Sequence, residues 1–459
     1  MNAHIKQYRK KHLSFWRRGT EVYFGLILYL CICKSFNLTA IKFKGISMLK
    51  LNKREKIIKR LRFISFLHDN SANPITRLLY SGISSTLLNE YNKLLTFDEQ
   101  YDRPIPCGTN VDIDSLMEGS IFANYRFANK SQLRRLVIGF QIPPFFTLSN
   151  RQLVKGETCL LIFLLKAAHE PSFAQMQLNT FKNLDHVAIG RAFNTFASWM
   201  YTKWQYLLND HWTFWVPRLP YCAEVIFTKL CTKFGMTHWS LADWSIACFI
   251  DNNIQQICRT GGGPVDDGED SRRWDFMIQN ATFTGWLRIH GVKFQTVDAP
   301  NGMAVHISGL WSARRNDLYT LQHSNINALF GDAQHLQPIQ YMMYGDSIYP
   351  WLSHLRSRYV GDPDSGYPLT ALEIELNDSM CGVRIAIEWD YKDDLQMFKI
   401  LRVKKYFKLR QSKCQEVLFS LHIFRNAYIA MNGGQTSRYF NYHQDVDFFE
   451  QWVAQGPRI

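Results

Sequence analysis

The sequence has ten cysteines but no CxxC pair and no group of cysteine and histidine at zinc-ligand spacing. Structural zinc sites collect their ligands through such short spacings, so the sequence excludes a zinc-finger type of fold. The scattered cysteines are typical of small buried side chains in a reducing compartment. With 46% apolar and 14% aromatic residues, the chain of 459 residues can form the cores of two or three domains.

Acidic residues are scarce in the first 62 residues, which carry 16 Lys and Arg against two Glu. The rest of the chain has 37 basic and 37 acidic residues, so the formal charge of +14 arises from this segment alone. Charge therefore predicts a polyanion partner only for the N-terminal segment. Its cluster "KREKIIKRLR" at 53–62 is typical of a nuclear import signal or a nucleic-acid arm, and equally of a solvated helix face.

The N-terminal segment also lacks an apolar run of membrane-spanning length. Its apolar run at 22–33 has 12 residues, whereas a bilayer requires roughly 20. No cleavage site of small residues follows this run. We therefore expect a basic, partly disordered extension over residues 1–110, no membrane anchor, and location in the nucleus.

Helical spacing dominates residues 111–220. The segment 129–140 places apolar residues at helical intervals behind Asn129, a candidate N-cap, and three further helices are predicted at 156–170, 171–181 and 182–208. These lengths resemble a helix-turn-helix, and the third helix would bury one apolar stripe. The stripe comprises Ile189, Phe193, Phe196 and Met200, and the candidate DNA-facing residues are His186, Arg191 and Asn194. Since short helices are common in proteins that never bind DNA, DNA binding by this helical domain stays an open alternative.

Strand-like runs replace the helical pattern after residue 221. They lie at 244–259, 283–300, 302–311 and 338–350, with helical spacing at 316–330 and 371–391. This order predicts an α/β layered domain over 221–445, followed by a tail at 446–459. The segment "GGGPVDDGED" between the first two strands is predicted to be a loop with solvated acids.

Three carboxylates end or interrupt apolar runs in this α/β region. Asp251 follows "ACFI", Asp346 follows "QYMMYG", and Glu388 lies on the predicted long helix. Buried carboxylates are costly unless they are hydrogen-bonded or bind cations, so three on separate elements suggest one shared site. Transfer of a phosphodiester needs such oxygen ligands, because Mg²⁺ prefers them and two ions about 4 Å apart can stabilise the attacking and leaving oxygens.

The motifs around these acids resemble those of PIF/Harbinger-type transposases, a group of DDE superfamily endonucleases. The resemblance covers about residues 125–445 and rests on a series of motifs in the family's order. These motifs are "FIDNNIQQICRT", "FTGWLRIHGVKFQ", "VDAPNGMAVHISG", "SARRNDLYTL", "YGDSIYPW", "MCGVRIAIEW" and "FRNAYIAMNGGQTSRYF".

This resemblance implies an RNase H-like mixed-sheet catalytic domain preceded by an all-α, helix-turn-helix-like domain. It places the catalytic and metal-binding acids at Asp251, Asp346 and Glu388, with the first on the central strand and the second just beyond the fourth strand. The implied cofactor is Mg²⁺ or Mn²⁺, as two ions. The implied partners are DNA, both transposon ends and target, a Myb-like accessory protein, and further copies of the chain.

Other residues at motif positions support or depart from the family pattern. Asp317 is expected at a helix start, with N-capping as its simplest role, and His290 and Lys293 match "HGLKFQ". Lys293 is expected to be solvated or to reach a phosphate. The departures are Asn252, Asn253, Leu287, Tyr391, Lys392 and Asp393, and Trp286 directly precedes Leu287. They favour the alternative of a catalytically inactive relative that binds DNA or protein, whereas the intact acids favour an active endonuclease.

Overall fold

The computed structural model divides the chain into two compact units, Met1–Arg103 and Pro104–Ile459. The structure describes residues 61, 64, 68, 81–88, 105–106, 111–236, 240–259, 269–361, 368–409 and 412–457. The apolar run at 22–33 and nearly all of the basic cluster at 53–62 lie outside this description. Over the residues that are described, no helix combines the length and the apolar character needed to cross a membrane.

The predicted helices are present in the first part of the second unit. They are α6 (Lys130–Gly139), α7 (Gly156–His169), α8 (Phe173–Asn179) and α9 (His186–Trp204). Asn129 caps α6 as expected, because its side chain accepts a hydrogen bond from the Gln132 amide at 3.0 Å. The apolar stripe of α9 is buried, as its spacing predicts. A short hairpin, β2 (Phe145–Thr147) and β3 (Gln152–Lys155), precedes α7 and was not predicted.

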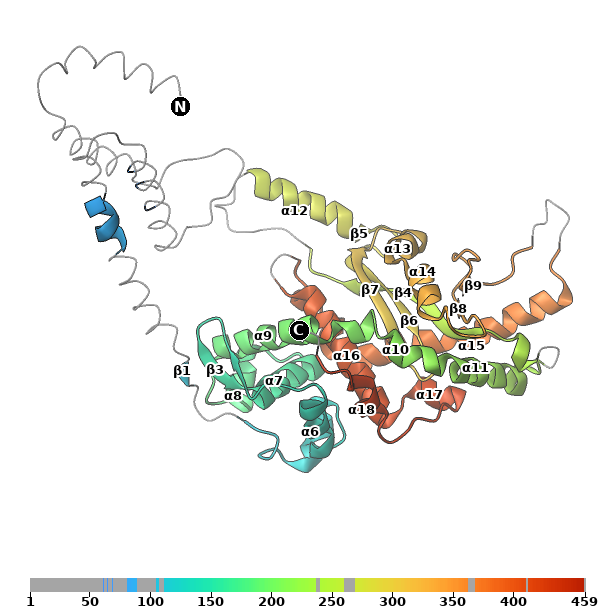
Figure 1. Cartoon of the computed structure of the whole chain (residues 1–459), viewed down its shortest axis with the longest axis horizontal. Coiled ribbons are helices and arrows are strands. Elements are labelled where there is room, and N and C mark those ends of the chain that lie inside the picture. Colours follow the sequence, from blue (N-terminus) through green and yellow to red (C-terminus); the bar gives the residue numbers. More distant parts are fainter. Residues whose placement is uncertain are drawn as a thin grey trace, which may run out of the picture. The chain divides into compact units, whose positions relative to one another are not determined.

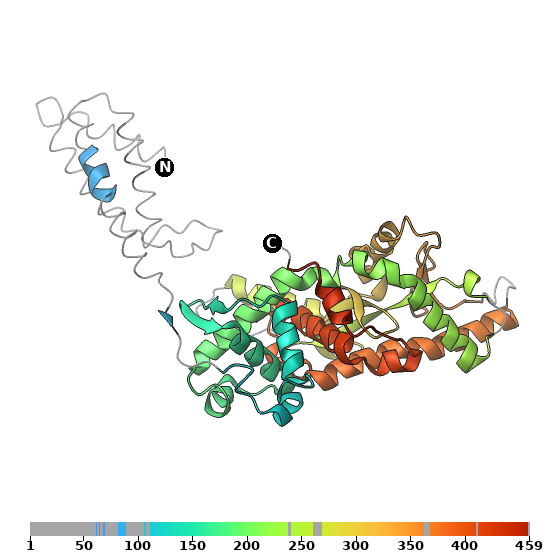
Figure 2. The ribbon, with the colours of Figure 1, turned by 60° about the horizontal axis from the view of Figure 1, so that its bottom comes forward.

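The helical core is completed by segments from the other end of the chain. Helix α16 (Cys414–Asn432) packs against α9, and α18 (Phe448–Val453) packs against α6 and α16. Figure 2 shows this as the cyan α6 beside the red C-terminal helices. Phe140 joins the two sets, since its ring makes edge contacts with Trp204, Phe424 and Phe449 at 5.2 to 5.6 Å. The predicted boundary near residue 220 stays a prediction.

A mixed sheet lies beside these helices (Figure 1). Its five main strands are β4 (Ile246–Gln256), β6 (Ile289–Asp298), β7 (Ala304–Ser312), β8 (Met342–Tyr344) and β9 (Leu355–Arg356), in the order β7-β6-β4-β8-β9. The pairs β4–β6 and β6–β7 are antiparallel, whereas β4–β8 and β8–β9 are parallel. Short β5 (Phe283–Thr284) pairs with the start of β6. The first of the five strands is thus central, which is consistent with an RNase H-like domain.

Helices flank this sheet. α11 (Leu219–Phe234) and α15 (Ala371–Met397) both contact β4, while α13 (Asp317–Ser324) contacts β6 and β7. The single helix expected at 316–330 is divided into α13 and α14 (Ile326–Ala333), because Asn325 adopts a left-handed conformation with φ 53°. Helix α12 (Glu269–Thr282), which extends away from the sheet in Figure 1, was not predicted.

Candidate active site

Strand pairing brings Asp251 and Asp346 to the same end of the sheet. Asp251 follows five buried residues of β4, and β4 runs parallel to β8 with Phe249 paired to Tyr344. Asp251 lies two residues after Phe249, and Asp346 lies two residues after Tyr344. Because parallel strands end on the same side, the two carboxylates emerge from neighbouring strands.

The backbone before Asp346 packs closely against the sheet. The Gly345 amide donates to the Arg356 carbonyl at 2.9 Å. A Cβ atom at Gly345 would lie 2.5 Å from the Tyr349 ring and 3.1 Å from Ile250. After this close approach the chain turns, and Asp346 Oδ1 accepts from the Ile348 amide at 3.0 Å. Gly345 therefore allows the turn that carries Asp346 to lie against β4.

The third acid, Glu388, lies on α15 one turn after Arg384. Thr370 and Glu373 cap the start of α15 with reciprocal hydrogen bonds, which fixes where the helix begins. Arg384 Nη1 donates to Asp251 Oδ2 at 3.0 Å, and Arg384 Nη2 lies 3.4 Å from Glu388 Oε1. The Arg384 and Asp251 side chains are 16% and 18% exposed, whereas Glu388 is 56% exposed. One guanidinium thus links the acid of the central strand to the acid of the helix.

Electrostatics connects Asp346 to the same guanidinium. Burial raises the pKa of Asp251 to about 6, Arg384 opposes this rise, and Asp346 and Asp317 add to it. Burial alone would lower the pKa of Arg384, but the charges of Asp251, Glu388 and Asp346 outweigh it and raise that pKa. Arg384 is therefore the common counter-charge of all three predicted acids. One arginine leaves this group with excess negative charge.

The donor chemistry of the three acids fits a divalent cation. Mg²⁺ and Mn²⁺ take hard oxygen ligands, which carboxylates supply. Within the described residues, however, no three side chains of His, Cys, Asp or Glu are grouped closely enough to hold one ion. Arg384 contacts Asp251 and Glu388, while Asp346 follows the neighbouring strand β8. The roles of the three acids as metal ligands and catalytic residues stay predictions.

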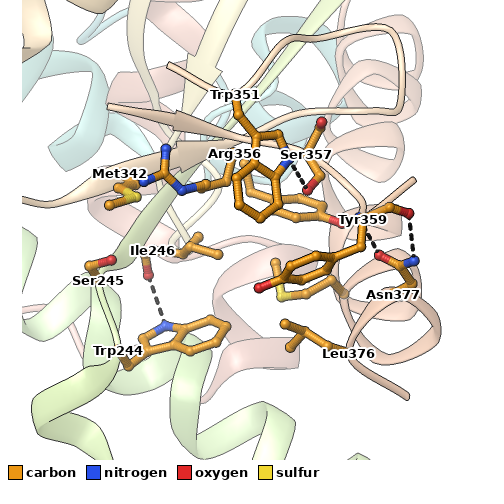
Figure 3. Close-up of a pocket in the computed structure, with 12 residues that line it drawn as sticks. Trp244, Ser245, Ile246, Met342, Trp351, Arg356, Ser357, Tyr359, Leu376 and Asn377 are labelled. Carbon is orange, nitrogen blue, oxygen red and sulfur yellow. Dashed lines mark hydrogen bonds between the residues drawn. The ribbon is translucent and has the colours of Figure 1, made fainter. Parts of the chain in front are cut away.

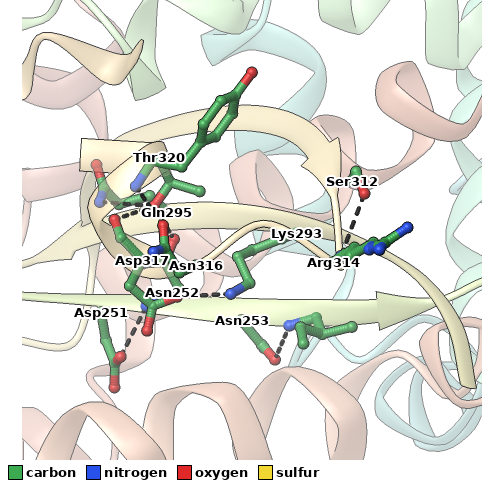
Figure 4. A network of polar contacts seen from close by, with 12 residues as sticks. Asp251, Asn252, Asn253, Lys293, Gln295, Ser312, Arg314, Asn316, Asp317 and Thr320 are labelled. Carbon is green, nitrogen blue, oxygen red and sulfur yellow. Dashed lines mark hydrogen bonds and ion pairs between the residues drawn. The ribbon is translucent and has the colours of Figure 1, made fainter. Parts of the chain in front are cut away.

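On the opposite side of β4 from Asp251, a polar network braces the strand (Figure 4). Asn252 Oδ1 accepts from the Thr320 hydroxyl at 2.9 Å, and Asn252 Nδ2 donates to the Tyr349 hydroxyl at 2.7 Å. Tyr349 also accepts from Gln295 Nε2 at 3.4 Å. Asn252, which departs from the family motif, thus ties β4 to α13 and to the turn after Asp346. The Asn252 side-chain amide therefore stabilises the strand that carries Asp251 and the turn that carries Asp346, from the face of β4 opposite Asp251.

Two expectations about motif residues are corrected by the structure. Lys293 is buried at 8% exposure, and its ammonium lies 2.7 Å from Asp317 Oδ1, so it is paired with a carboxylate and is not solvated. Asp317 is the first residue of α13, but Asn316 is the N-cap, since it accepts from the Tyr319 amide at 2.9 Å. The Lys293 ammonium explains this difference, because it holds the Asp317 carboxylate against β6.

The remaining departures from the motif differ in burial. The Tyr391 hydroxyl lies 2.7 Å from the Thr296 hydroxyl, which joins α15 to β6. By contrast, Trp286 and Leu287 lie on the turn between β5 and β6 and are 87% and 40% exposed. His290 packs against Phe283 with ring centroids 5.3 Å apart. In the hydrogen bonds and ion pairs of the described chain, none of the four motif residues Tyr391, Trp286, Leu287 and His290 contacts the three acids.

Sequence reasoning missed Arg384 as the centre of the acid group. Its position four residues before Glu388 on a predicted helix was a usable signal, since such residues face the same side. The contact between Arg384 and Asp251 had no such signal, because it depends on how α15 crosses the sheet.

No curated protein and no solved structure matches the chain. A family model does match part of it, from residue 271 to residue 426. The matched segment includes Asp346, Arg384 and Glu388 and begins after Asp251. Over residues 271–426 the chain is similar to the family described as DDE superfamily endonuclease.

Proposed function

We propose that this chain is a DDE transposase-like endonuclease that hydrolyses DNA phosphodiesters and transfers strands in a metal-dependent reaction. The observation that carries the proposal is the contact of the Arg384 guanidinium with Asp251 and Glu388, next to the strand β8 that leads to Asp346. The match to DDE superfamily endonucleases supports it, because it covers two of the three acids. The proposed role of all three is to hold Mg²⁺ or Mn²⁺, as two ions.

Bound divalent cations would activate the attacking oxygen and stabilise the leaving oxygen of the phosphodiester. The residues of this chain contribute position and charge. Asp251 is fixed by β4, and Asp346 is fixed by the turn that Gly345 and Tyr349 hold in place. Glu388, on α15, is exposed enough to meet a ligand from solvent. In the proposed reaction, water frees a 3′-hydroxyl, which then attacks a target strand.

The finer features of the proposal follow the motif resemblance. They are the PIF/Harbinger subtype, transposon ends and target DNA as substrates, a Myb-like accessory protein, assembly with further copies, and location in the nucleus. A fluorescent fusion of the full chain tests the last feature. Recovery of that fusion in carbonate-resistant membranes would contradict it.

The proposal includes DNA contact by the helical part of the chain. Opposite its buried stripe, α9 exposes His186 and Asn194 and leaves Arg191 half-buried. If Arg191 contacts a phosphate, Arg191→Ala weakens DNA binding. The slope of log K against log salt concentration should then fall by about one. Unchanged affinity together with an unchanged salt slope would remove this part of the proposal.

A second candidate function is a catalytically inactive relative that binds DNA or a protein. The observation that favours it is Arg384, because its guanidinium already supplies positive charge between Asp251 and Glu388. Exposure of Trp286 at 87% is consistent with a protein contact. The two functions differ in whether the acids bind a divalent cation and cleave DNA.

Nicking of supercoiled plasmid by the purified full chain in Mn²⁺ or Mg²⁺ separates the two functions. Asp346→Asn keeps the side-chain shape and removes one ligand charge, so nicking should fall by orders of magnitude while DNA affinity is retained. Asp332→Asn is the matched control, because this substitution makes the same chemical change at an exposed acid on α14. It should leave nicking unchanged.

Calorimetry with Mn²⁺ gives the second measurement. Saturable binding that is lost in Asp251→Asn and Asp346→Asn, together with nicking, supports the endonuclease. Wild-type protein that binds DNA but neither nicks it nor binds Mn²⁺ would establish the inactive relative instead.

A further inference from the structure

A small cavity opens between the β8–β9 edge of the sheet and the first half of α15. Its volume is about 170 Å³. The side chains that give it its chemistry are Trp244, Tyr344, Trp351, Arg356, Tyr359 and Met380. Figure 3 shows the rings of Trp244, Trp351 and Tyr359 around this space, which we call the aromatic pocket. It lies outside the group of acids described above.

Hydrogen bonds hold the two indoles and the backbone of Tyr359 in the aromatic pocket. The Trp244 indole donates to the Ile246 carbonyl at 3.1 Å, and the Trp351 indole donates to the Ser357 carbonyl at 3.1 Å. Asn377 bonds both the amide and the carbonyl of Tyr359, at 2.7 and 2.9 Å. With their polar atoms bonded to the backbone, the two indoles offer the pocket mainly their apolar faces.

Arg356 adds a fixed positive charge to the same space. Its Nη1 donates to the carbonyls of Leu352 and Leu355, the latter at 3.1 Å, and its guanidinium carbon lies 5.2 Å from the centre of the Trp351 ring. An arginine has five N–H donors, and Nε and Nη2 carry three of them. Trp351 is 46% exposed, so this pairing of a ring with a cation lies at the mouth of the pocket.

The aromatic pocket and the acids share one face of α15. Asn377, Met380, Arg384 and Glu388 are separated by three, four and four residues, which places them along one side of a helix. Tyr344 on β8 links the pocket to the acids, since it lines the pocket and lies two residues before Asp346. A DNA strand at the acids would therefore pass beside the pocket.

We propose that the aromatic pocket binds one unpaired nucleobase of the DNA strand that is held at the acids, with Arg356 contacting the adjoining phosphate. This inference rests on the proposed function for the identity of the strand. A planar base matches aromatic faces with few free hydrogen-bonding groups, and stacking of a base on such rings contributes about 1–3 kcal/mol. A cation beside the ring suits the phosphate that accompanies every base.

Fluorescence anisotropy with a labelled twelve-nucleotide oligothymidylate tests the proposal on the full chain without requiring cleavage. Trp351→Ala and Tyr359→Ala should each weaken binding of this single strand about 5-fold to 100-fold, and binding of a matched duplex should change less. Trp351→Phe keeps an aromatic ring and should restore most of the affinity. Trp286→Ala is the matched control, because it removes an 87% exposed indole from the β5–β6 turn.

Thermal unfolding of each variant identifies any that fail to fold. If an alanine variant does not fold, the affinity of Trp351→Phe for oligothymidylate tests the proposal instead. An affinity for oligothymidylate that is unchanged in Trp351→Ala and Tyr359→Ala overturns the proposal. The aromatic pocket would then be a site for the side chain of a protein partner. Wild-type protein that does not bind the oligonucleotide saturably also overturns it. Loss of nicking in Asp346→Asn concerns only the proposed function, since that variant should retain the single-strand affinity.

Discussion

Arg384 Nη1 on α15 donates to Asp251 Oδ2 on β4 at 3.0 Å, although 133 residues separate the two along the chain. The contact joins the long helix to the central strand, and Arg384 also contacts Glu388. It has two consequences. Arg384 offsets the negative charge of the acids, and a divalent cation that binds Asp251 and Glu388 would compete with its guanidinium.

Replacing Arg384 by Gln tests both consequences. Without the guanidinium, Asp251 loses its counter-charge, so the free energy of unfolding in chelator should fall by about 2 kcal/mol, less than for fully buried pairs because Glu388 is half exposed. Added Mn²⁺ should then stabilise the variant more than it stabilises the wild type. Urea denaturation with and without Mn²⁺ measures both effects.

Lys392→Gln is the matched control, because Lys392 is an exposed cation on the same helix. It should change stability by less than about 0.5 kcal/mol. If Arg384→Gln unfolds like the wild type in chelator and responds equally to Mn²⁺, Arg384 is not the counter-charge of this group.

A second buried ion pair positions α15 against α16. Arg425 Nε lies 2.6 Å from Asp394 Oδ1, with side chains 4% and 7% exposed, and Arg425 also donates to the Gly302 carbonyl at 2.7 Å. Asp394→Asn removes the carboxylate that is paired with a buried guanidinium, so the free energy of unfolding should fall by about 3–5 kcal/mol. Asp114→Asn, at a 73% exposed carboxylate paired with Arg134, should cost about 1 kcal/mol or less. Similar urea midpoints for the two variants would contradict the buried pair.

The local features of the fold could be predicted from the sequence. Asn129 caps α6, and the α9 stripe is buried, because both patterns depend on residues within a few positions of each other. The order of strands and acids also followed from apolar runs and from the motif resemblance. The outcome for α13 and α14 shows the limit, since the single left-handed residue Asn325 divided a continuous helical pattern.

The site itself could be predicted only in part. Asp251, Asp346 and Glu388 were chosen because they end or interrupt apolar runs at motif positions. Their actual neighbours depend on tertiary packing, and therefore Arg384 was missed and Lys293 was expected in solvent. Sequence alone does not show which of two adjacent polar residues caps a helix when a buried lysine holds the other, as with Asn316 and Asp317.

Buried His306 predicts a pH dependence of stability. It lies on β7 at 2% exposure with its ring stacked on Trp212, and burial lowers its pKa to about 4 from the ordinary 6.5. Between pH 6.5 and 4, His306 is therefore protonated in the unfolded chain and neutral in the folded chain. The free energy of unfolding should be fully retained above pH 6.5 and fall by about 3 kcal/mol as the pH drops to 4.

Urea denaturation at a series of pH values measures this dependence in wild type and His306→Phe. Phenylalanine keeps a ring against Trp212 but takes up no proton, so the slope between pH 6.5 and 4 should flatten by that amount. Equal slopes would show that His306 is not the group responsible.

The last prediction concerns the close approach of Gly345 to the turn that carries Asp346. A Cβ atom there would lie 2.5 Å from the Tyr349 ring, and Tyr349 is itself held by Asn252 at 2.7 Å. Gly345→Ala must therefore move the Tyr349 ring or the turn, which should lower the free energy of unfolding by about 1–3 kcal/mol. Because Asp346 moves with this turn, Mn²⁺ affinity should fall as well. Gly285→Ala, at a position with no atom within 4 Å of the added Cβ, should leave both quantities unchanged. If Gly345→Ala lowers stability and leaves Mn²⁺ affinity intact, the turn shapes the fold without positioning Asp346 for a cation.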